Sequence, residues 1–237
     1  MITAHGLMKR FGNLPVLRGV DLQIDAGRVT AIVGPNAAGK TTLIKSILGL
    51  VRPDAGELRI DGRPVGDDPG YRAGIGYMPQ IARFPENLTG NDLVAMLIDL
   101  RRHTPEIDRS LIERLHLEGE MTKPLRTLSG GTRQKVNAVI AFLFMPDLLI
   151  LDEPTSGLDP VSSSILKDSI AAARRDGRTV ILTSHVMSEL EELADDVVFL
   201  LDGRVRFAGP VHDIKLHTRQ LSLERALAHM MRRVEAA

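Results

Sequence analysis

The chain has 237 residues, in which 30 Lys and Arg balance 30 Asp and Glu, and it contains no cysteine. This length allows one large domain or a domain with a subdomain. Balanced charge without a basic block argues against a dedicated nucleic-acid binder, and the lack of cysteine excludes disulfides, thiolate nucleophiles and cysteine-based metal sites. The first residues do not predict a secretory signal, and the longest strongly apolar run, 138–145, is far shorter than the roughly 20 residues that span a bilayer. We therefore expect any membrane role to depend on a partner.

The first third of the chain is predicted to be rich in strands. Strands are expected at 2–7 and 16–24, where they would form an antiparallel layer. A third strand, 28–33, is almost purely apolar and leads through a glycine-rich turn into a helix that begins near Lys40. Shorter strands are predicted at 57–60 and 75–78. Because nearly pure apolar strands are typical of a sheet covered on both faces, the pattern indicates an α/β fold.

Helical spacing replaces the strand pattern after Phe84, and the region of about 84–145 is predicted to be a helical insertion. Within it, Pro105 is expected to open a helix that continues through Leu117. The α/β pattern then resumes, with helices predicted at 129–144, 161–174 and 186–193 and strands at 148–151, 179–183, 197–200 and 205–208. A short helical tail is expected over about 211–237.

The segment from Gly34 to Thr41 reads G-P-N-A-A-G-K-T, a pattern typical of phosphate-binding loops. In such a loop, backbone N–H groups converge on phosphate oxygens and the following helix adds its positive dipole end. Lys40 is then expected to reach the outer phosphates, and the Thr41 hydroxyl to hold Mg²⁺. We therefore expect this loop to bind a nucleoside triphosphate. The alternative is a glycine turn without a ligand, which the preceding strand and the following helix disfavour.

Two further segments carry candidate chemistry. Asp152 and Glu153 end an apolar strand, where Asp152 is expected to hold Mg²⁺ through water and Glu153 to orient and polarise the attacking water. The alternative is a solvated acidic turn. Ser129, Gly130 and Gly131 are predicted to start a helix and to form a second anion site, although as an N-cap alone they would be unremarkable.

Six segments in register resemble the ATP-binding subunits of ABC transporters over practically the whole chain. They are GPNAAGKTT, Gln80, LSGGTRQ, LLILDE, Ser156-Gly157-Leu158-Asp159 and Thr183-Ser184-His185. The resemblance implies a P-loop NTPase core sheet with an antiparallel β subdomain and the inserted helical subdomain. It also implies ATP hydrolysis, a head-to-tail homodimer and a separate transmembrane permease. The chain would then be cytoplasmic and peripheral on the inner face of the cell membrane.

The resemblance also assigns roles to single residues. Phe11 would stack on adenine, Gln80 would contact Mg²⁺ and report to the helical insertion, and His185 would sense the γ-phosphate. Ser129, Gly130 and Gly131 of one subunit would close over the ATP held by the other, with Asp159 at the shared boundary. The remaining nucleotide contacts would come from Gly34, Pro35, Asn36, Ala37, Ala38, Gly39, Lys40, Thr41 and Thr42. Glu153, His185 and Gln80 would be the catalytic residues, and Thr41, Gln80 and Asp152 the metal ligands.

The chain departs from the family pattern at two positions. Ala37 stands where the family usually has Gly, and a positive φ there would cost roughly 1 kcal/mol because of its Cβ. Thr132 stands where the family usually has Gln, and since it keeps a short polar side chain near the second anion site we expect little change.

Three classes of function are considered: a transport ATPase, a soluble mechanical ATPase acting on DNA or ribosomes, and a kinase for a small substrate. The stretch between Lys40 and Leu128 is of ordinary transporter size, only one cassette is present, and no acceptor pocket is evident. A soluble ABC-type ATPase acting in cofactor or complex assembly stays as the alternative. Segments 75–89 and 128–144 look exporter-like, and most resemble the ATPase of the system that matures copper-containing nitrous oxide reductase.

Overall fold

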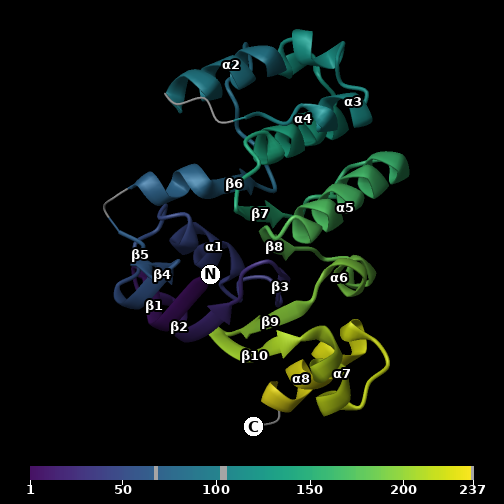
Figure 1. Cartoon of the computed structure of the whole chain (residues 1–237). Coiled ribbons are helices and arrows are strands. Elements are labelled where there is room, and N and C mark those ends of the chain that lie inside the picture. Colours follow the sequence, from purple (N-terminus) through teal and green to yellow (C-terminus); the bar gives the residue numbers. More distant parts are fainter. Residues whose placement is uncertain (67–68, 102–105, 236–237) are drawn as a thin grey trace. The chain divides into compact units, whose positions relative to one another are not determined.

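The computed structural model describes residues 1–66, 69–101 and 106–235, with side chains up to Arg232 (Figure 1). The chain forms two compact units. The first, here called the N/C unit, comprises residues 1–72 and 181–237, and the second, the middle unit, comprises residues 73–180. The middle unit is therefore inserted, in sequence, into the N/C unit.

An antiparallel sheet makes up one part of the N/C unit. It contains β1 (Ile2–Phe11), β2 (Leu14–Ile24), β4 (Ala55–Ile60) and β5 (Arg63–Pro64), in the order β2-β1-β4-β5. β1 and β2 form a hairpin in which Ile2 pairs with Ile24, and both of these side chains are buried. The predicted antiparallel layer is confirmed, although β1 and β2 are longer than the pattern indicated.

The second part of the N/C unit is built on the apolar strand β3 (Val29–Val33), all of whose residues are buried. β3 is parallel to β9 (Asp196–Leu201), which is antiparallel to β10 (Arg204–Pro210). The helices of this unit are α1 (Lys40–Ile47), α6 (Met187–Leu193), α7 (Val211–Thr218) and α8 (Leu223–Glu235). The last two, yellow in Figure 1, form the predicted helical tail.

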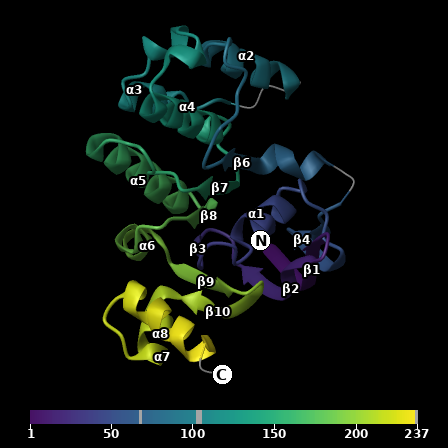
Figure 2. The same ribbon diagram turned by 180° about the vertical axis from the view of Figure 1, so that it is seen from behind.

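The middle unit contains a parallel strand pair and the predicted helices. β6 (Ile75–Met78) pairs with β7 (Leu148–Asp152), with Ile75 opposite Leu148. Its helices are α2 (Gly90–Leu100), α3 (Ser110–Arg114), α4 (Gly130–Phe142) and α5 (Pro160–Arg175). Helices α2, α3 and α4 gather together in both ribbon views (Figures 1 and 2). β8 (Thr179–Thr183) then leads the chain from the middle unit back into the N/C unit.

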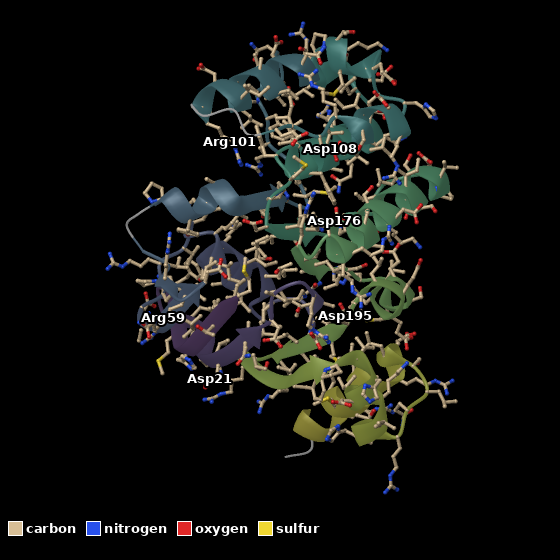
Figure 3. All side chains as sticks on the ribbon, in the orientation of Figure 1. Asp21, Arg59, Arg101, Asp108, Asp176 and Asp195 are labelled. Atoms are coloured by element: carbon tan, nitrogen blue, oxygen red, sulfur yellow. The ribbon has the colours of Figure 1, made fainter. Side chains whose placement is uncertain are left out.

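Close backbone packing and capping explain local features of this unit. A Cβ on Gly76 of β6 would lie 2.1 Å from the Ala141 carbonyl oxygen, so glycine lets α4 approach the strand. Thr89 and Asp92 form a reciprocal capping box that starts α2. After α2 ends, the Arg101 guanidinium (labelled in Figure 3) lies 3.9 Å from the Phe144 ring centroid and donates to the Ala73 carbonyl at 2.8 Å. Burial lowers the pKa of Arg101.

One predicted helix is wrong in its extent. Helix α3 ends at Arg114 and does not continue to Leu117, because His116 adopts a left-handed backbone with φ of 52°. Leu115 and Leu117 are nevertheless buried on either side of this turn. Pro105, predicted to open the helix, lies outside the described residues. None of the helices in the described ranges combines the length and apolar character needed to cross a membrane.

Candidate nucleotide site

The phosphate-loop segment lies between β3 and α1, and packing explains its two fixed glycines. A Cβ on Gly34 would lie only 2.1 Å from the Leu200 carbonyl oxygen. This distance is too short for any side chain at that position. Gly39, the N-cap of α1, has φ of 106°, and a Cβ there would lie 3.0 Å from the Val16 carbonyl oxygen. The glycines therefore let the loop run against β2 and β9 and still enter the helix.

Lys40 occupies the first turn of α1 and turns back over the loop. Its Nζ donates to the carbonyl oxygens of Gly34, at 2.5 Å, and Pro35, at 3.0 Å. The ammonium thus lies above the turn whose amides would face phosphate oxygens, at the positive end of the helix dipole. Exchanging neutral carbonyl acceptors for anionic phosphate oxygens would strengthen its hydrogen bonds.

Ala37 has φ of 64°, which lies in the left-handed region. A residue with a Cβ is disfavoured there by roughly 1–2 kcal/mol. The loop is therefore strained at one residue that the family usually fills with glycine.

His185 is exposed and belongs to the same unit as the phosphate loop. With Gly34 and Pro35 it lines a cavity of about 320 Å³, to which α8 contributes Leu227 and Met231. The predicted phosphate sensor therefore lies beside the phosphate loop. Phe11, at the end of β1, is 50% exposed, and the Lys9 Nζ is 5.5 Å from its ring centroid.

The predicted carboxylates end β7 in the middle unit. Asp152 is the last residue of the strand and is half-buried. Glu153 follows with φ of 54°, an uncommon conformation for a residue other than glycine. Strained backbone of this kind costs on the order of 1–3 kcal/mol and clusters at functional sites. Burial, with the nearby charge of Asp152, raises the pKa of the Tyr77 hydroxyl on β6.

Helix α4 holds the strained turn after β7 in place. The Gln134 amide, 8% exposed, donates to the carbonyl oxygens of Glu153, at 3.3 Å, and Pro154, at 3.4 Å. One turn further along, the fully buried Asn137 donates to the Pro79 carbonyl at 2.8 Å, immediately before Gln80. The same helix therefore positions the backbone of the predicted water-activating residue and of the predicted glutamine.

The start of α4 also meets the turn that carries Asp159. Ser129 is the N-cap of α4, and a Cβ on Gly131 would lie 2.9 Å from the Gly157 carbonyl oxygen. Asp159 is the N-cap of α5 and accepts from the Ser162 N–H at 2.9 Å and the Ser162 hydroxyl at 2.7 Å. The Nζ of Lys135 in α4 also forms an ion pair with the Oδ2 of Asp159, at 3.0 Å.

The structure thus gathers the predicted site residues in two groups. Phe11, the segment 34–42 and His185 lie in the N/C unit, and Gln80, the segment 129–131, Asp152, Glu153 and Asp159 lie in the middle unit. Sequence reasoning gave no role to Gln134, Lys135 and Asn137, which support the second group, although Gln134 ends the segment LSGGTRQ. The available signal was the run of polar residues in the first half of α4, ahead of its apolar second half.

Comparison with known proteins identifies the family. The sequence pattern of the ABC transporter family matches residues 17–156. The Nod factor export ATP-binding protein I of Ralstonia nicotianae is 31% identical over 92% of this chain and 69% of that protein. The daunorubicin resistance ATP-binding protein DrrA3 of Streptomyces coeruleorubidus is 35% identical over 92% of this chain and 70% of that protein. The lantibiotic transport ATP-binding protein SrtF of Streptococcus pyogenes is 31% identical over 86% of this chain and 89% of that protein.

Solved structures agree with this assignment. An ATP-binding subunit of an ABC transporter superposes with a TM-score of 0.88 at 30% identity, over 98% of this chain and 99% of that one. A dimeric ATP-binding cassette in a post-hydrolysis state bound to ADP and Pi gives a TM-score of 0.78 at 23% identity, over 89% of this chain and 98% of that one. This second likeness shows the fold alone. The matched residues include the phosphate loop, the α4 start and both carboxylates, and the chain belongs to the ABC transporter family as one of its ATP-binding, ATP-hydrolysing subunits.

Proposed function

We propose that this subunit energises a separate membrane permease by closing head to tail on a second copy around two ATP molecules. The observation that carries this proposal is the position of Lys40, whose ammonium lies over the phosphate loop between two glycines that packing requires. In the closed pair, the segment 129–131 of one copy would complete the site that holds ATP at Lys40 of the other.

The oxygen donors of the chain fit a magnesium ion. Mg²⁺ takes hard oxygen ligands, and the Thr41 hydroxyl, the Gln80 amide oxygen and the Asp152 carboxylate are of this kind. Within the described residues no cluster of three or more His, Cys, Asp or Glu could hold a metal ion. Bound by Thr41, Gln80 and Asp152, Mg²⁺ would neutralise charge on the phosphates.

The remaining residues divide the work of hydrolysis. Lys40 binds the outer phosphates, and Glu153 accepts a proton from the attacking water, whose oxygen bonds to the γ-phosphorus as the bond to ADP breaks. His185 donates to the γ-phosphate and so distinguishes ATP from ADP. The Phe11 ring stacks on adenine, and its 50% exposure leaves a face available for that contact.

The permease contact is assigned to a groove of the middle unit. A cavity of about 410 Å³ follows Gln80 and combines apolar with charged side chains. Ile81, Phe84 and Leu125 supply the apolar part, and Arg83, Glu86 and Arg133 supply the charges. Ile81 is 73% exposed, so its apolar side chain is available to a partner that docks in this groove. Docking there would place the chain at the inner face of the membrane.

The names of the three relatives point to export as the direction of transport, since they refer to Nod factor export, daunorubicin resistance and lantibiotic transport. The cargo of this chain stays a prediction. The narrower resemblance to nitrous oxide reductase maturation would make it a copper or sulfur species. The alternative, an ATPase of cofactor or complex assembly, would use the same nucleotide chemistry without a permease.

The shared site is tested with Glu153→Gln, which keeps a hydrogen bond to water but cannot take up its proton. Hydrolysis should fall by about two to four orders of magnitude while nucleotide affinity is kept. Light scattering with saturating MgATP should then show a dimer, and with MgADP a monomer. A monomer under both conditions would contradict head-to-tail closure. Co-purification with a membrane subunit from detergent extracts separates a transporter from an assembly ATPase.

A further inference from the structure

Two hydroxyl groups meet at the start of α4. The Oγ of Ser129 lies 2.8 Å from the Oγ1 of Thr132, and it accepts a hydrogen bond from the Thr132 backbone N–H at 3.1 Å. Thr132 therefore contacts the serine through both its hydroxyl and its backbone N–H. The hydroxyl contact exists because this chain has Thr where the family usually has Gln.

A count of protons shows what the pair can do. A serine hydroxyl has one proton to donate and two lone pairs to accept with. The Thr132 N–H takes one lone pair of the Ser129 Oγ. The Thr132 hydroxyl can then either accept the serine proton or donate its own proton to the second lone pair. In the first arrangement Ser129 donates its proton to the Thr132 hydroxyl. In the second, the Ser129 proton is available to another acceptor.

An approaching phosphate selects between these arrangements, because its oxygens accept hydrogen bonds and have none to donate at neutral pH. The Ser129 proton would turn to the phosphate, and the Thr132 proton would turn to Ser129. The serine oxygen would then accept two hydrogen bonds while donating one. Hydrogen bonds that are coupled in this way strengthen one another in a site from which water is excluded.

We propose that Thr132 is a positioning residue for Ser129. With it, the Ser129 hydroxyl switches from donating to the Thr132 hydroxyl to donating to the outer phosphates of ATP on the opposing subunit. The inference rests on the proposed function, which places Ser129 against that ATP. Thr132 itself contacts Ser129 and needs no contact with the nucleotide. Because Ser129 is exposed in the single subunit, water can replace the Thr132 hydroxyl there. We therefore expect Thr132 to matter only when two subunits close around ATP.

The test compares Thr132→Val, which keeps the branched shape, with Thr132→Ser, which keeps the hydroxyl. Both are made in the Glu153→Gln background, and ATP-dependent dimerisation is titrated by light scattering. Thr132→Val should weaken dimerisation about ten- to a hundredfold, because the closed pair contains two such sites and each loses one hydrogen bond worth about three- to tenfold. Thr132→Ser should stay within about twofold of the parent. ATP binding by the single subunit, measured below the dimerisation range, should be unchanged in both.

A matched control is Thr122→Val, because the Thr122 hydroxyl also makes a local hydrogen bond, in its case by donating to the Gly119 carbonyl at 2.8 Å. It should leave dimerisation unchanged. Circular dichroism checks that each variant keeps its helices, and Thr132→Ala, with the same expected loss as Thr132→Val, replaces that variant should it misfold.

The outcomes separate this inference from the proposed function. Dimerisation of Thr132→Val at the parental affinity would overturn the switch, and so would equal losses in Thr132→Val and Thr132→Ser, because shape alone would then matter. Ser129→Ala serves as the reference. Parental closure of Ser129→Ala would contradict the shared site itself, whereas a loss in Ser129→Ala without a loss in Thr132→Val defeats the switch alone.

Discussion

Lys135 of α4 and Asp159 at the start of α5 form an ion pair, with Nζ and Oδ2 3.0 Å apart. The hydroxyl and backbone N–H of Ser162 act first, and the Lys135 ammonium second, to hold the pKa of Asp159 well below its ordinary value of 3.8. The pair therefore connects the helix that begins at the second anion site to the turn that resemblance places at the dimer boundary.

This lowered pKa predicts a stability that depends on pH. Because the folded state lowers the pKa, the contribution of Asp159 is present above its ordinary value of 3.8 and is lost as the pH falls toward the folded-state value. The free energy of unfolding of the parent minus that of Asp159→Asn should shrink as the pH falls below about 4. Urea unfolding over a pH series measures it, and a difference that stays flat with pH would contradict the assignment. Lys135→Met should remove only part of the effect.

Lys40→Ala should weaken MgATP binding by about ten- to a hundredfold, because hydrogen bonds to charged groups are worth about 1.5–3 kcal/mol. Titration with a fluorescent ATP analogue measures the dissociation constant. Lys45→Ala is the matched control, since Lys45 is exposed in the last turn of the same helix. This variant should bind ATP with the affinity of the parent. An unchanged affinity for Lys40→Ala would remove Lys40 from the site.

Ala37→Gly should stabilise the protein. Removing the Cβ from a left-handed residue recovers roughly 1–2 kcal/mol, and the greater freedom of glycine in the unfolded chain offsets about 0.4–1 kcal/mol of that. The melting temperature should rise by about 1–4 °C. The neighbouring Ala38 is buried and not left-handed, so Ala38→Gly should lower the melting temperature. A fall in both variants would show that the Ala37 side chain contributes contacts that outweigh its strain.

Ile81→Asp should reduce association with the membrane subunit by at least tenfold while ATP binding by the free subunit is kept. The change puts a charge where an apolar contact is expected, and since Ile81 is 73% exposed, the fold should tolerate it. Pull-down from detergent extracts measures the association. Leu221→Asp, at a leucine that is 89% exposed between α7 and α8, is the matched control. Equal capture of both variants would place the docking surface elsewhere.

The sequence predicted the buried strands β3 and β7 to within one residue at each end, for a physical reason. β3 and β7 are apolar because the folded protein covers them, and burial of this kind leaves a continuous apolar run. The spacing of apolar residues after Ser110 also indicated correctly which side chains are buried, since Leu115 and Leu117 are both in the core. It did not report conformation, because the left-handed His116 lets a turn bury the same two leucines that a helix would.

The sequence singled out residues whose side chains are expected to contact a ligand and missed residues whose side chains contact backbone. Ser129, Asp152 and Glu153 stand out because their types and spacing reflect chemistry. Gln134 and Asn137 bind carbonyl oxygens of other segments, and every residue presents such a carbonyl. Their role therefore became visible only when the fold placed α4 against the turns after β6 and β7.

The pairing of β3 with β9 sets an order of events during synthesis. The Val29 N–H bonds to the carboxylate of Asp195 at 3.0 Å, across 166 residues of chain. At the usual 5–20 residues per second, translation takes roughly ten to thirty seconds to cover that interval. The buried apolar strand β3 therefore leaves the ribosome well before its parallel neighbour exists, while the whole middle unit is still being made. Slow codons within residues 73–180 would lengthen this exposure, and the nascent N-terminal segment is where we expect chaperones to bind.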